Sequence, residues 1–152
     1  MSMSKPRLVG LNHVALEVGD IEDALRFYRA VFSFELRGTH EDDEGRTVMA
    51  FLDMGDQFVA LSAGRTQPPD TGRHFGLVVD DRSHVMELAK AAGATVLDRP
   101  FNVLDPWGNH LEIVAYRDVQ FTKTDGVLRA MGLDLDKTDE AREELRRKLT
   151  KS

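Results

Sequence analysis

The stretch "HVALEVGD", residues 13–20, decides the fold, because "HFGLVVDD" repeats its pattern at residues 74–81. Both stretches run histidine, apolar, small, leucine, any residue, valine, any residue, aspartate, and the two histidines are 61 residues apart. Each stretch leads into apolar residues at helical spacing and then into short strand-like segments. Repetition on this scale is typical of a duplicated supersecondary unit. The sequence therefore predicts the order βαβββ twice.

The segments between and after the repeats set the expected boundaries. In the first copy, Asp20 is a good helix N-cap, and strands are expected within 34–42, 45–56 and 57–64. "RTQPPDTG" (65–72) is rich in turn formers and is the best internal linker. We expect an α+β fold in which modules 8–64 and 73–117 form one domain, 8–117, with a curved mixed sheet. "TDGVLRAMGL" (124–133) and "TDEAREELRRKL" (138–149) predict a helical C-terminal extension over 118–152.

The composition narrows the class of protein. The chain has 152 residues, 41% of them hydrophobic and 30% charged, as in ordinary globular domains. A net charge of -6 disfavours nucleic acid and anionic membranes as partners. There is no cysteine, which excludes disulfides, thiolate ligands and a cysteine nucleophile. No apolar run approaches the ~20 residues of a membrane span, so we expect a cytoplasmic protein.

Strand alternation places three possible metal ligands on equivalent faces. Residues two apart in a strand share a face. Val14, Leu16 and Val18 are expected to face the helices, which turns His13 the other way, and the repeat gives His74 the same orientation. In "NHLEIVAY" (109–116), the apolar alternation turns His110 and Glu112 away from the helices. If the two sheets curve together, His13, His74 and Glu112 point toward a common concave surface.

Two imidazoles and one carboxylate are suited to a divalent metal, and three protein ligands leave positions open for a substrate. Taken alone, a strand histidine is more often structural, and Glu112 could face solvent. The equivalence of His13 and His74 across the repeat favours the interpretation that both are metal ligands. His40 and His84 have no such equivalence and are interpreted as structural residues. We expect Fe(II) or Mn at the site, with Ni, Zn or Co as alternatives.

The paired modules and the stretches "LNHVALEV", "HFGLVVDD" and "DPWGNHLEIV" resemble the vicinal oxygen chelate superfamily. That group includes glyoxalase I, extradiol dioxygenases, methylmalonyl-CoA epimerases, fosfomycin-resistance enzymes and bleomycin-binding proteins. The likeness covers roughly residues 8–117. It implies that His13, His74 and Glu112 are metal ligands, the same three that strand alternation selects. It also implies a small-molecule substrate, and many such proteins are homodimers.

The sequence departs from each named activity. Ala60 stands where glyoxalase- and epimerase-like members carry a fourth ligand, and Gln57 could replace it only if the strand register slips. Asn102 stands where the dioxygenases carry an acid/base tyrosine, and Ala15 where the fosfomycin-resistance enzymes carry a threonine. The segment 97–105 is also too short for the loop that those enzymes use to bind the antibiotic. The expected substrate cavity is lined by Phe58, Ala60, Asn102 and His110.

Three functional hypotheses stay open. The first is a metal-dependent enzyme of dioxygenase or lyase/isomerase type, in which the metal binds two neighbouring oxygens of a small substrate. The second is a metal-free binding protein of the bleomycin-resistance type. The third is an interaction protein whose C-terminal helices, with the thin apolar stripe Ala141, Leu145 and Leu149, are the functional part.

Overall fold

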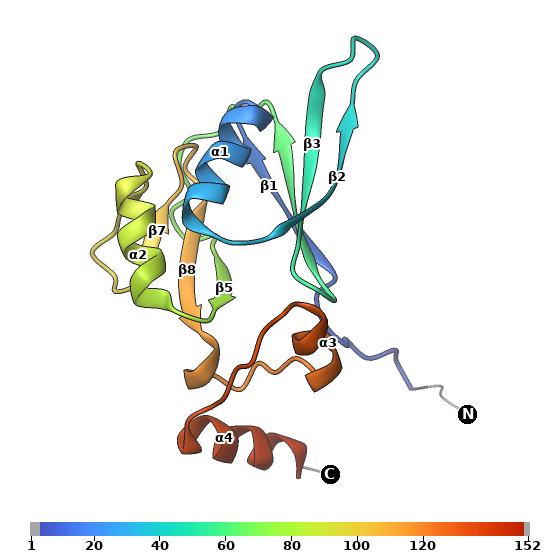
Figure 1. Ribbon diagram of the computed structural model, residues 1–152, viewed down its shortest axis with the longest axis vertical. Coiled ribbons are helices and arrows are strands. Elements are labelled where there is room, and N and C mark those ends of the chain that lie inside the picture. The colour runs from blue at the N-terminus through green and yellow to red at the C-terminus, as the bar shows by residue number, and fades with distance from the viewer. Residues whose placement is uncertain (1–3, 151–152) are drawn as a thin grey trace.

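The computed structural model describes residues 4–150 and has the expected order of elements (Figure 1). The first module comprises β1 (His13–Val18), α1 (Ile21–Val31), β2 (Glu35–Glu41), β3 (Thr47–Asp53) and β4 (Phe58–Ala63). The second comprises β5 (Phe75–Val79), α2 (Arg82–Ala91), β6 (Thr95–Val96), β7 (Asn102–Leu104) and β8 (His110–Ala115). The prediction of two βαβββ modules is confirmed.

The two modules build two equivalent four-stranded mixed sheets. The strand orders are β1-β4-β3-β2 and β5-β8-β7-β6. In each sheet the first strand runs parallel to the last strand of its module and forms one edge of the sheet. The register pairs Ala15 with Ala60 in the first sheet, and Gly76, the counterpart of Ala15 in the repeat, with Glu112 in the second. Equivalent positions of the repeat therefore occupy equivalent places.

Both helices begin at aspartates. The side chain of Asp20 accepts a hydrogen bond from the amide of Asp23 at 3.0 Å, and Asp81 accepts one from His84 at 3.0 Å. Such caps satisfy amides that have no partner within the helix. Helix α2 ends before Gly93, whose φ of +98° is a left-handed conformation that glycine adopts readily. The caps align the start of each helix with the end of β1 or β5.

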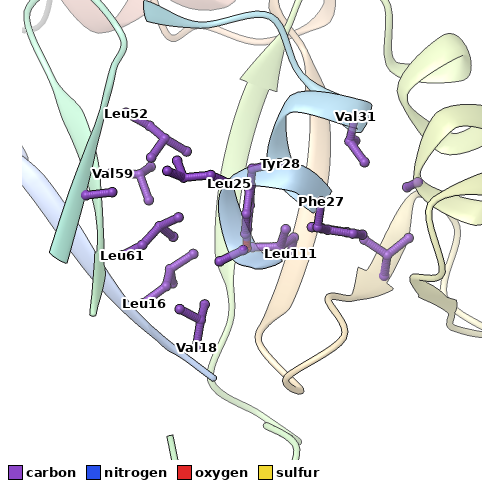
Figure 2. Close-up of a cluster of buried hydrophobic side chains, with 14 of the residues drawn as sticks. Leu16, Val18, Leu25, Phe27, Tyr28, Val31, Leu52, Val59, Leu61 and Leu111 are labelled. Carbon is purple, nitrogen blue, oxygen red and sulfur yellow. The ribbon is translucent and has the colours of Figure 1, made fainter. Parts of the chain in front are cut away.

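One continuous core joins the modules (Figure 2). Leu16 and Val18 of β1 and Leu61 of β4 pack with α1, and Leu111 of β8 lies on the other side of that helix. The two helices also pack against each other. The apolar faces of both sheets thus look into the same core. Burial of this apolar surface is the main force that holds the modules together.

A buried polar network crosses the same junction. The hydroxyl of Tyr28 donates to Asp105 Oδ2 at 2.7 Å, and Asn109 Nδ2 donates to that carboxylate at 2.8 Å and to the carbonyl of Glu17 at 2.9 Å. Arg65 completes the network by donating to Asn109 Oδ1 at 2.6 Å. Because Tyr28 and Glu17 belong to the first module and Asp105 and Asn109 to the second, these bonds set the orientation of one module on the other.

The C-terminal segment packs onto the end of both modules. It contains a 3-10 helix, η1 (Tyr116–Asp118), and the helices α3 (Asp125–Ala130) and α4 (Asp139–Leu149). Lys137 holds the segment together internally by donating to the carbonyls of Tyr116 and Val119 at 2.6 and 2.7 Å, and Lys123 joins it to the first module through an ion pair with Asp56. The predicted helical extension is therefore confirmed (Figure 1). Among residues 4–150, no helix has both the length and the apolar character needed to cross a membrane.

Candidate metal centre

The open face of the second sheet brings two of the expected ligands together. His74 lies immediately before β5, and Glu112 lies on the neighbouring strand β8. His74 Nε2 is 3.4 Å from Glu112 Oε2, and the two side chains are 35% and 33% exposed. The pair is therefore rigidly placed by the sheet and still accessible from outside.

The hydrogen bonds of both expected imidazole ligands favour the same tautomer. His74 Nδ1 lies 3.0 Å from the carbonyl oxygen of Gly72, and His13 Nδ1 lies 2.8 Å from Asn12 Oδ1. A carbonyl oxygen only accepts, so each Nδ1 carries the proton when the imidazole is neutral. Each Nε2 then keeps a lone pair for a cation. Metal-binding histidines commonly use their second nitrogen in this way.

His13 occupies the equivalent place on the open face of the first sheet. It is exposed at the start of β1, and its ring stacks on Phe58 of β4 with centroids 4.7 Å apart and planes 9° apart. The stacking and the bond to Asn12 hold the imidazole in one orientation. The strand pattern predicts the position of His13, but it does not predict these two contacts. The stack follows from the β1–β4 register, which is not local in sequence.

A single chain does not form the common surface that we expected. Among residues 4–150, no group of three or more His, Cys, Asp or Glu side chains is arranged to hold a metal ion. Because the apolar faces of both sheets look into one shared core, the opposite faces, which carry His13 and Glu112, point away from that core. Each sheet therefore presents only its own part of the expected ligand set.

The expected cavity residues occupy different environments. Asn102 and His110 are buried next to the His74–Glu112 pair, and His110 Nε2 donates to Asn102 Oδ1 at 2.7 Å. Burial, followed by the neighbouring His74, lowers the pKa of His110 below its usual value. Ala60 is buried at 2% exposure, and its methyl side chain has no atom that could bind a metal. Phe58 lines a hollow on the surface.

Comparison with known proteins identifies the family. Residues 10–148 match the family model of the Glyoxalase/Bleomycin resistance protein/Dioxygenase superfamily. The chain therefore belongs to this superfamily. A lactoylglutathione lyase of Neisseria meningitidis is 32% identical over 95 residues, which are 57% of this chain and 69% of that protein.

Solved structures share the fold. The fosfomycin resistance protein FosX of Mesorhizobium loti is 21% identical, with a TM-score of 0.60 over 82% of this chain and 99% of that one. FosX of Listeria monocytogenes, solved with Mn(II) and sulfate, is 19% identical, with a TM-score of 0.60 over 70% and 92% of the two chains. The sequence relative is thus named as a lyase, and the Listeria protein was solved with a divalent metal.

Proposed function

We propose that the protein is a divalent-metal enzyme whose site is shared between two copies of the chain. His13 of one copy joins His74 and Glu112 of the other. The substrate is a small molecule that binds the metal through two neighbouring oxygens. The observation that carries this proposal is the His74–Glu112 pair: His74 Nε2 faces the Glu112 carboxylate at 3.4 Å, while His74 Nδ1 is held by the carbonyl of Gly72.

The separation of the ligands within one chain supports two copies rather than one. His13 and the His74–Glu112 pair lie on open faces that point away from the shared core, and β1 and β5 are both edge strands. A two-fold dimer uses the same surface on both copies. A contact between the β1 side of one copy and the β5 side of the other then forms two identical sites at once.

The residues present fit a divalent cation. Two neutral imidazoles and one carboxylate suit Mn, Fe, Ni, Co or Zn, and they leave open positions for substrate oxygens. Asn12 and the carbonyl of Gly72 orient the imidazoles. When bound, the metal supplies Lewis-acid polarisation of those oxygens. The lyase name of the sequence relatives favours lyase or isomerase chemistry over dioxygen chemistry.

Metal binding tests the proposal directly. We expect H13A, H74A and E112Q each to reduce Mn(II) affinity by at least tenfold, because each removes one of three ligands. H40A is the matched control, since His40 is an exposed histidine on β2. Isothermal titration calorimetry measures the affinities. Undiminished affinity in H74A would show that the ligand assignment is wrong.

A metal-free binding protein is the second candidate, because one chain does not assemble three ligands by itself. This candidate predicts that protein purified without chelators contains less than about a tenth of an equivalent of metal. It also predicts that Fe, Mn, Ni, Zn and Co all fail to restore binding. Elemental analysis before and after reconstitution separates the two candidates.

A further inference from the structure

A hollow of about 320 Å³ lies beside His13 on the open face of the first sheet. Its lining includes Asn12, which is bonded to His13, and Phe58, on which His13 stacks. The hollow therefore adjoins His13 through two residues that contact this proposed metal ligand. Arg37 of β2 forms another part of its wall.

A bulge in β2 directs Arg37 to this place. Leu36 pairs with Leu52 and Gly38 with Phe51, so Arg37 is an extra residue without a partner on β3. Bulges of this kind change the direction in which a side chain points. The guanidinium carbon of Arg37 lies 4.8 Å from the centroid of the Phe58 ring. A regular strand would not have supplied this additional side chain.

Arg37 and His13 contact the same aromatic ring. The Arg37 guanidinium carbon is 4.8 Å and the His13 ring centroid 4.7 Å from the Phe58 centroid. The separation between the guanidinium and the imidazole is therefore at most the sum of these two distances. A small substrate can reach from one to the other. The stacking also limits the positions that the long arginine side chain adopts.

The charges around the hollow leave the guanidinium available. Asp56 forms an ion pair with Lys123, and Asp53 accepts the amide of Gly55 at 3.1 Å. Among the described residues, no carboxylate lies within 4.0 Å of the Arg37 side-chain nitrogens. A guanidinium presents paired N–H donors that match the two oxygens of a carboxylate.

We propose that Arg37 binds a carboxylate of the substrate, at the end remote from the oxygens that reach the metal. This inference rests on the proposed function, because it uses the metal site at His13 as its second anchor. It assigns the substrate to a class: small anionic molecules with two neighbouring oxygens at one end and a carboxylate at the other.

Two probes that differ by one carboxylate test the inference. Catechol has two neighbouring oxygens, and 3,4-dihydroxybenzoate adds a carboxylate on the far side of the ring. Calorimetry on the Mn(II)-loaded protein at low salt should show at least about fivefold tighter binding of 3,4-dihydroxybenzoate. R37Q should bring the ratio of the two affinities close to one. D53N should increase the ratio, because it removes a nearby negative charge.

R46Q is the matched control, since Arg46 lies in the β2–β3 turn and is paired there with Asp42 at 2.9 Å. It should keep the wild-type ratio. Equal binding of both probes by the Mn(II)-loaded wild type, or an unchanged ratio in R37Q, would overturn the role of Arg37 and leave the metal site standing. Failure of the wild type to bind Mn(II) would overturn both proposals.

Discussion

Replacing Tyr28 with phenylalanine isolates one bond of the network that joins the modules. Tyr28 is 1% exposed, and its hydroxyl donates to the buried carboxylate of Asp105 at 2.7 Å. Burial, followed by the charge of Asp105, raises the pKa of Tyr28, so the hydroxyl stays protonated and donates throughout the neutral range. The variant keeps the ring in the core and removes only this donor.

The expected cost follows from the charge on the acceptor. A hydrogen bond to a charged group contributes about 1.5–3 kcal/mol, so we expect Tyr28→Phe to lower the free energy of unfolding by about 2 kcal/mol. For a chain of this size the melting temperature should fall by about 4–8 °C. Urea denaturation followed by circular dichroism measures the first quantity, and a thermal scan measures the second.

Tyr116 offers the matched control. It is also buried, at 5% exposure, and no hydrogen bond of its hydroxyl is found among residues 4–150. Tyr116→Phe should change the free energy of unfolding by less than about 0.5 kcal/mol. Equal effects of the two substitutions would refute the idea that the Tyr28–Asp105 bond stabilises the junction.

Two further substitutions test the segment that links the modules. Burial alone would raise the pKa of Asp70, but hydrogen bonds from Arg65 and Arg73 outweigh it and lower the pKa. The carboxylate therefore stabilises the fold above its unfolded pKa, near 3.9, and this stability is lost as pH falls through the lower folded pKa. Asp70→Asn should lower the free energy of unfolding by about 2 kcal/mol at pH 7. The variant should also lose less stability than the wild type as the pH falls below about 5. Urea denaturation at several pH values measures both effects. Gly108 has a φ of +91°, and a Cβ there would lie 2.6 Å from Pro69 Cα. Gly108→Ala should cost about 2–4 kcal/mol in the same denaturation assay, whereas Gly126→Ala, where a Cβ meets nothing within 4 Å, should cost nothing. An unchanged free energy of unfolding in Gly108→Ala would contradict the close contact with Pro69. An unchanged loss of stability at acid pH in Asp70→Asn would contradict the stabilising role of this carboxylate.

The local pattern of the sequence was enough to predict the modules. Strand alternation correctly separated Leu16 and Val18, which are buried, from His13, which is exposed. It did so because a strand's period of two is a property of neighbouring residues. The equivalence of His13 and His74 followed from the repeat for the same reason.

The arrangement of the modules could not be predicted in this way. It depends on contacts such as Tyr28–Asp105, between residues 77 positions apart, which leave no periodic signal. Strand alternation alone therefore predicts that the histidine faces converge within one chain, whereas the shared core turns those faces outward. The bulge at Arg37 also depends on pairing with β3, and the strand pattern of residues 34–42 gives no sign of it.

A heterodimer of two defective chains tests the shared site most directly. The H13A and H74A chains are co-expressed with different affinity tags, and the heterodimer is purified through both tags. In this heterodimer one site combines an intact His13 with the partner's intact His74. We predict about one bound Mn(II) per heterodimer, about two per wild-type dimer, and none in either variant alone. A heterodimer that binds no Mn(II) while the wild type does would contradict the proposal that two chains share each metal site.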